Sequence, residues 1–138
     1  MAPKQPVNRL NFSSPLYSEA IIHNGLIYCS GKIGLDPSTG KLAGDVAEQT
    51  KAALRLLEAV LHAAGSDLTK MLKCNLYLTN MSDYAAMNAA YIEIVPDPKP
   101  ARVCVPVAEL GRGAKVEIDC IASIEGDAKP ESRVARLA

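Results

Sequence analysis

The segment from Asp45 to Ala64 carries the clearest helical pattern in this sequence, and it requires a second layer to cover it. Asp45 is followed three residues later by Glu48, a spacing typical of a capping box, and Gly65 supplies a stop. The apolar positions that share one face of the helix are Ala53, Leu57, Val60, Leu61 and Ala64. Such a helix packs against a sheet or another helix, so the rest of the chain decides the fold class.

Strand patterns supply that second layer. Residues 17–33 predict a hairpin, because apolar stretches flank Asn24-Gly25, a strong short-range turn signal. Gly31 and Gly34 interrupt its second strand, which marks a bulge or the close approach of another group. The other strands are expected near Arg9–Phe12 and at 71–78, 101–107 and 115–124.

A second helix completes the predicted order of elements. Ser82 or Asp83 is its expected cap, and the proline-rich residues 96–100 stop it at about Val95. The order β-β-β-α-β-α-β-β predicts an α+β fold, with a mixed sheet carrying two helices on one face. We expect one domain over residues 1–125 and a polar C-terminal tail over 126–138.

Composition excludes several classes of function. Lys+Arg and Asp+Glu balance at 15 each, and with five Tyr and one Phe the chain has no basic, aromatic surface for nucleic acid. The four cysteines form no CxxC pair and have no ligand spacing with either histidine, so we expect buried free thiols and no metal site. No membrane span, signal peptide or transit pattern is present, which predicts a cytoplasmic protein and leaves a mitochondrial one open.

One helical layer covers only one face of a sheet, so the composition of the other face decides whether the chain must associate with further copies. An apolar second face would have to be buried by association, which predicts a homo-oligomer. The residues expected to form it are Ala20, Ile22, Val103, Val105, Cys120 and Ala122.

Arg102 is the charged residue that most needs an explanation. It lies in the apolar stretch 100–105, where strand alternation puts Arg102 and Cys104 on one face. An arginine on a mostly buried strand is costly unless an anion meets its guanidinium. The partner is either an internal carboxylate, with Glu117 of the stretch 114–118 as the candidate, or the carboxylate of a ligand.

The two stretches Pro-Ala-Arg-Val-Cys-Val (100–105) and Gly-Ala-Lys-Val-Glu-Ile (113–118) resemble the signature of the RidA/YjgF family of reactive-intermediate deaminases. Tyr-Ser-Glu-Ala at 17–20 and Cys-Ser-Gly-Lys-Ile-Gly at 29–34 also resemble family segments, and the resemblance covers about residues 9–124. The sequence departs from the family pattern at Pro15-Leu16, Leu56 and Gly111-Arg112.

The resemblance implies a chorismate-mutase-like fold and a homotrimer with three clefts between subunits. It implies hydrolysis of 2-imino acids, such as 2-iminopropanoate and 2-iminobutanoate, to 2-keto acids and ammonia without a metal or organic cofactor. Arg102 and Glu117 are the expected catalytic residues. The substrate-binding positions that it implies besides Arg102 are Tyr17, Ser30, Gly31, Asn88 and Cys104, the last through its backbone.

This chemistry suits the residues. A bidentate guanidinium at Arg102 would fix the substrate carboxylate, and Glu117 would orient or deprotonate the attacking water. Glu117 could instead be only the ion-pair partner of Arg102. Two other functions compete: a ketoacid-binding or chaperone-like oligomer without turnover, and an endoribonuclease or translation inhibitor, against which the neutral charge argues.

Overall fold

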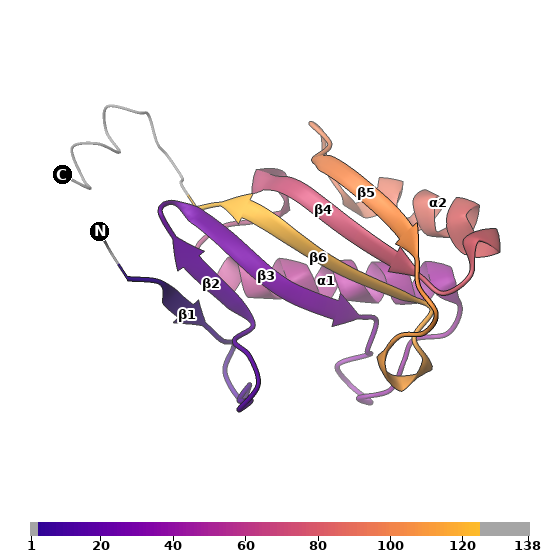
Figure 1. Cartoon of the computed structure of the whole chain (residues 1–138), viewed down its shortest axis with the longest axis horizontal. Helices are drawn as coiled ribbons and strands as arrows, with labels where there is room; N and C mark the ends of the chain where they lie inside the picture. Colours follow the sequence, from indigo (N-terminus) through magenta and orange to yellow (C-terminus); the bar gives the residue numbers. More distant parts are fainter. Residues whose placement is uncertain (1–2, 125–138) are drawn as a thin grey trace.

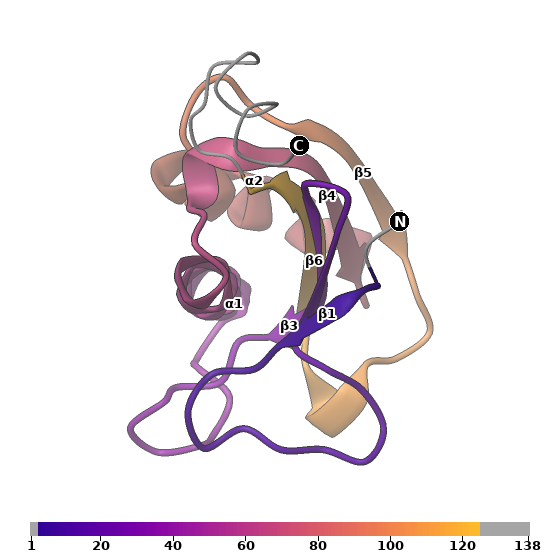
Figure 2. The ribbon, with the colours of Figure 1, turned by 90° about the vertical axis from the view of Figure 1, so that its left-hand side faces the viewer.

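Both helices lie on one face of a six-stranded mixed sheet, in a computed structural model that describes residues 3–124 (Figure 1) (Figure 2). The strands run in the spatial order β1-β2-β3-β6-β4-β5, and all neighbours are antiparallel except the parallel pair β4 and β5. The elements are β1 Gln5–Val7, β2 Ala20–His23, β3 Leu26–Ile33, α1 Val46–Ala63, β4 Met71–Leu78, α2 Tyr84–Ile94, β5 Ala101–Pro106 and β6 Val116–Ser123. The predicted α+β fold and order of elements are confirmed.

The hairpin of β2 and β3 turns where the sequence predicts it. Asn24 and Gly25 adopt φ values of 53° and 79°, the left-handed conformations that a tight two-residue hairpin turn requires. The strand predicted near Arg9–Phe12 is wrong. The Phe12 N–H donates to the Arg9 carbonyl at 3.0 Å and Asn11 is left-handed at 71°, so this segment is a turn, and the first strand lies earlier, at β1.

The two helices begin differently. At α1 the predicted capping box is confirmed, because Glu48 N–H donates to Asp45 Oδ1 at 2.9 Å and Asp45 N–H donates to Glu48 Oε1 at 3.2 Å. The side-chain cap predicted for α2 is wrong. Asp83 precedes the helix but makes no capping hydrogen bond, since a short 3-10 turn comes first and Asn80 caps that turn.

The core lies between the sheet and the helices, and it contains several residues that were expected on the second, open face of the sheet. Alternation along β6 sends Cys120 and Ala122 into this core, and Ala20 of β2 lies there too. These three side chains therefore do not belong to the open face, and neither does Ile22, which is partly buried and packs against the same core. Val103 and Val105 do lie on the open side and are 43% and 36% exposed, so that face is apolar only in part.

Three further expectations concern the cysteines, membrane-spanning helices and the C-terminal tail. Cys29, Cys74 and Cys120 are buried free thiols, as expected, whereas Cys104 is a free thiol that is only half-buried. Neither helix of the described residues is long and apolar enough to cross a membrane. The predicted polar tail, residues 126–138, lies outside the residues that the structure describes.

Candidate functional site

Arg102 lies on β5, at the edge of the sheet and next to α2. It is in register with the buried Cys74 of β4, so its side chain leaves the sheet on the helix side. The guanidinium carbon lies 4.8 Å from the ring centre of Tyr91 and 5.8 Å from that of Tyr84. Arg102 Nη2 also donates to Tyr84 Oη at 3.2 Å. The expectation that Arg102 lies on a mostly buried strand is wrong, because β5 is a partly exposed edge strand. The Arg102 guanidinium therefore keeps further N–H donors for a ligand.

Asn88 lies on the face of α2 whose tyrosines contact this arginine. Asn88 follows Tyr84 by four residues and precedes Tyr91 by three, so all three share one face of α2. The Asn88 Oδ1 and Tyr91 Oη atoms are buried without a hydrogen-bond partner among the described residues. Buried polar atoms are normally paired, so this region has unused capacity for hydrogen bonds.

Two ionisable neighbours of Arg102 are held neutral. Burial raises the pKa of Cys104, and the positive charge of Arg102 offsets this only in part. Burial likewise raises the pKa of Tyr91 to about 12. A thiol with a raised pKa is a poor nucleophile, so Cys104 fits a binding role better than covalent catalysis.

Glu117 lies on the opposite, open face of the sheet. It is in register with Tyr77 on β6 and β4, and its neighbours Val116 and Ile118 point into the core. A pocket of about 410 Å³ opens over it, lined by Tyr17, Ser30, Gly31, Ile33, Gly111 and Glu117. Four of the predicted site residues therefore meet in one place.

Gly31 explains how the Glu117 carboxylate fits this pocket. The register of β3 against β6 shifts between Cys29 and Lys32, which is the predicted bulge. A Cβ atom added at Gly31 would lie 3.0 Å from Glu117 Cδ and would overlap Oε2. Both alternatives for this glycine hold: it forms a bulge, and the bulge allows the carboxylate to lie directly against the backbone.

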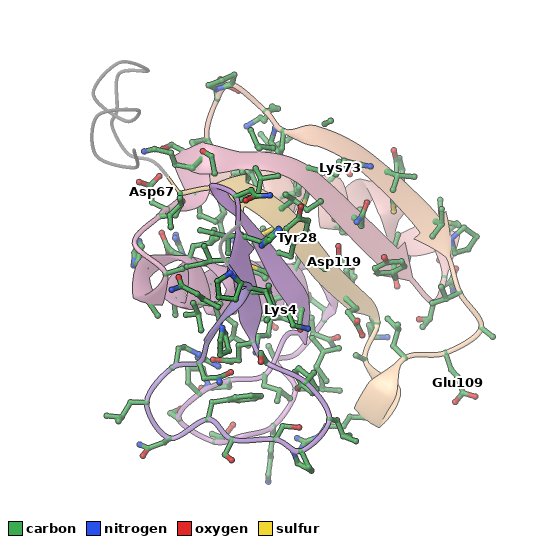
Figure 3. All side chains as sticks on the ribbon, turned by 60° about the vertical axis from the view of Figure 1, so that its left-hand side comes forward. Lys4, Tyr28, Asp67, Lys73, Glu109 and Asp119 are labelled. Carbon is green, nitrogen blue, oxygen red and sulfur yellow. The ribbon has the colours of Figure 1, made fainter. Side chains whose placement is uncertain are left out.

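Asp119 sets the charge around Glu117. Its two carboxylate oxygens accept hydrogen bonds from Asn75 Nδ2 at 2.7 Å and from Tyr77 Oη at 3.0 Å. Figure 3 labels Asp119 on the same open face as Tyr28. Burial and, after it, the negative charge of Asp119 raise the pKa of Glu117. Within residues 3–124 the Glu117 carboxylate accepts no hydrogen bond, which suits a group that handles a proton.

A buried ion cluster fixes the loop that carries Tyr17. Glu19 is fully buried and accepts from Arg9 Nη2 at 2.6 Å and from Lys32 Nζ at 2.5 Å. Burial alone would raise the pKa of Glu19, but the hydrogen bonds from Arg9 and Lys32 outweigh it and hold the pKa at about 2. Ser30 adds to this anchor, because its N–H donates to the Glu19 carbonyl and its hydroxyl to the Ser18 carbonyl at 2.7 Å.

The predicted residues thus form two half-sites. Tyr17, Ser30, Gly31 and Glu117 line one pocket on the open face, while Arg102, Asn88 and Cys104 lie at the β5 edge toward α2. No ion pair joins Arg102 to Glu117 in the described part of the chain, so the alternative of an internal pair between them is wrong for a single chain.

Sequence reasoning missed two sets of residues. Tyr84 and Tyr91 flank Arg102, and their spacing of seven with Asn88 between them was the available signal. The cluster at Glu19 was marked only by two charges, Glu19 and Lys32, in an otherwise apolar hairpin. Among residues 3–124 no group of His, Cys, Asp and Glu side chains could hold a metal ion.

Known proteins resemble this chain over most of its length. The family model described as Endoribonuclease L-PSP matches residues 10–124. "Protein mmf1, mitochondrial" of Schizosaccharomyces pombe is 46% identical over 128 residues, which are 88% of this chain and 77% of that protein. The 2-iminobutanoate/2-iminopropanoate deaminase of Rattus norvegicus is 41% identical over 107 residues, covering 77% and 78%. The crystal structure of E. coli TdcF with bound serine has a TM-score of 0.80 at 27% identity, covering 86% of this chain and 98% of that one.

Proposed function

Since the chain belongs to the RidA/YjgF family, the family of the Endoribonuclease L-PSP model, we propose that it hydrolyses 2-imino acids to 2-keto acids and ammonia. The expected substrates are 2-iminopropanoate and 2-iminobutanoate, the compounds named for the rat relative. The observation that carries the proposal is the pair of half-sites: an arginine with free donors and a carboxylate that has no partner among residues 3–124, presented on opposite faces.

These half-sites complete each other when two copies of the chain meet. The Arg102 half-site lies at a sheet edge, where a neighbouring molecule can reach it, and the Glu117 pocket opens on the uncovered face. A ring of identical subunits joined head to tail places one surface against the other in every contact. We therefore propose the homotrimer that the family resemblance implies, with each cleft built from the Arg102 of one copy and the Glu117 of the next.

In such a cleft the reaction needs little beyond orientation and one proton carrier. Arg102 holds the substrate carboxylate through two parallel hydrogen bonds and so fixes the C=N carbon. Glu117 accepts a proton from the water whose oxygen forms a bond to that carbon, giving a tetrahedral aminoalcohol. The same carboxyl returns this proton to the nitrogen, then takes the proton of the new hydroxyl and passes it to that nitrogen. The C–N bond breaks as the C=O bond forms, and ammonia and the 2-keto acid leave.

The remaining groups support this path. Asn88 and the backbone at Cys104 lie beside Arg102 and supply hydrogen-bond capacity to the carboxylate end. Tyr17 and Ser30 line the Glu117 pocket, in which we propose that the reacting carbon lies. The site is proposed to need no cofactor. The cytoplasm is the proposed location, with mitochondria as the alternative that the name of the S. pombe relative favours.

The test is a comparison of wild type with Arg102→Ala on enzymatically generated 2-iminopropanoate. Wild type is expected to accelerate formation of the ketoacid, and Arg102→Ala is expected to lose that acceleration while its circular dichroism stays unchanged. Arg55→Ala is the matched control, because Arg55 is an exposed arginine of α1 outside both half-sites. A wild-type protein without acceleration would contradict the proposed function, and full activity in Arg102→Ala would remove the carboxylate clamp.

Two other activities remain as outcomes of the same test. A protein that binds 2-keto acids through Arg102 but accelerates nothing is the binding oligomer of the sequence analysis. RNA cleavage that survives extensive purification and is lost in Arg102→Ala would favour the endoribonuclease activity named in the family description. The balance of 15 basic and 15 acidic residues gives little general attraction for a phosphate backbone.

A further inference from the structure

A second pocket adjoins the Glu117 pocket and carries positive charge. Its volume is about 450 Å³, and it shares Tyr17, Gly31 and Ile33 with the Glu117 pocket. The two are therefore neighbouring parts of one hollow. Three cationic side chains line this second pocket, which we call the arginine pocket: Arg9, Lys32 and Arg112.

The three cations are held in different ways. Lys32 is buried, donates to Glu19, and lies 5.3 Å from the ring centre of Phe12. Arg9 uses Nε and Nη2 on the same Glu19 carboxylate, which leaves its Nη1 group without a partner among the described residues. The negative groups at the pocket are Glu19 and Asp36, so three positive charges face two negative ones.

Arg112 is the cation of this pocket that has no carboxylate partner in the described residues. It comes from the turn between β5 and β6 and adopts φ of 58°, in the left-handed region that an arginine seldom occupies. Its Nη1 donates to the Gly40 carbonyl at 3.1 Å across the pocket, and Arg112 as a residue is exposed. The turn therefore presents a fixed, unneutralised guanidinium beside the candidate site.

The walls between these cations are apolar, with Phe12, Leu35 and Leu56 among them. A pocket with apolar walls and a few placed charges favours a ligand of the same pattern, a short methylene chain that ends in an anion. The methyl group of 2-iminopropanoate would leave the arginine pocket empty, whereas a longer acidic side chain would reach it from the Glu117 pocket.

We propose that the arginine pocket binds the side-chain carboxylate of the substrate, so that this chain prefers 2-imino acids derived from acidic amino acids. This inference rests on the proposed function, because it uses the same cleft for the reacting carbon. The bound substrate would then be held at both ends, by Arg102 of one copy at the 1-carboxylate and by Arg112 at the far carboxylate.

Binding of stable keto acids tests this directly by calorimetry. The probes are 2-oxoglutarate and 2-oxopentanoate, which have the same five-carbon chain with and without the terminal carboxylate. We expect wild type to bind 2-oxoglutarate about tenfold more tightly, a difference typical of one hydrogen bond to a charged group. Arg112→Gln should abolish that advantage and leave the affinity for 2-oxopentanoate unchanged, which also shows that the variant is folded.

Arg55→Gln is the matched control, since it removes one arginine charge from the surface outside the arginine pocket. It should keep the preference for 2-oxoglutarate. Equal affinities for the two probes in wild type, or an unchanged preference in Arg112→Gln, would overturn the inference and leave the proposed function intact. Failure to bind either keto acid would contradict the proposed function and the inference with it.

Discussion

Replacing Gly31 by alanine should strongly lower the activity by moving Glu117, without unfolding the protein. An added Cβ would lie 3.0 Å from Glu117 Cδ and 3.2 Å from Cγ, and it would overlap Oε2. The carboxylate would have to retreat by about 1 Å to restore ordinary contact, and a displacement of that size in a catalytic group can cost about a hundredfold in rate. The backbone of Gly31 is not left-handed, so alanine adds no conformational strain there.

The assay is the kcat/KM for 2-iminopropanoate, measured with Gly31→Ala, Gly111→Ala and Glu117→Ala. Gly111 lines the same pocket, but nothing lies within 4 Å of its added Cβ, so this control should keep nearly full activity. If Gly31→Ala acts through Glu117, it should have no further effect in a Glu117→Ala background. Full activity in Gly31→Ala, or independent losses that multiply in the double variant, would refute the reasoning.

Three further predictions follow from the charged groups. Arg102→Lys should raise KM about tenfold in the same assay, because a lysine cannot form the two parallel hydrogen bonds, and an unchanged KM would exclude the clamp. Since burial and, after it, the negative charge of Asp119 raise the pKa of Glu117, the rate should fall as pH drops through that pKa, and Asp119→Asn should move this acid limb to lower pH in a pH–rate profile; a limb that stays in place contradicts it. Glu19→Gln should lower the free energy of unfolding in urea by about 3–5 kcal/mol, because it leaves the buried Lys32 and the half-buried Arg9 without their anion. The pKa of Glu19 is held at about 2 against an ordinary 4.5, so its carboxylate should stabilise wild type fully above pH 4.5 and progressively less as pH falls toward about 2. If the stability of wild type did not fall over this pH range and only Glu19→Gln lost stability, the ion cluster would be contradicted.

Local signals in the sequence predicted the elements of the fold well. The Asn24-Gly25 turn and the Asp45–Glu48 capping box act within a few residues, and both formed as expected. The face of the sheet on which a strand residue lies depends on the register between strands. That register is set by contacts between segments far apart in the sequence, so local signals do not reveal it. That is why Cys120 and Ala122 were placed on the open face although β6 turns them into the core.

The candidate site shows the same limit more sharply. Arg102 and Glu117 stood out as charges in apolar stretches, whereas Tyr17, Ser30 and Gly31 were implied by the family resemblance; Tyr17, Ser30, Gly31 and Glu117 do share a pocket. The sequence could not predict that Arg102 lies on the opposite face of the sheet from these residues. The face that Arg102 occupies is set by the register of β5 with β4, which is a contact between distant segments. The contact of Arg112 with Gly40 spans 72 residues and carries no local signal at all.

The central claim is that each cleft joins Arg102 of one copy to Glu117 of the next, and mixing two inactive variants tests it most directly. Arg102→Ala and Glu117→Ala are co-expressed in equal amounts and assayed together on 2-iminopropanoate. The account predicts recovery of roughly a quarter of the wild-type rate, because in a randomly mixed ring that share of clefts pairs both intact residues. A mixture as inactive as the separate variants would contradict it.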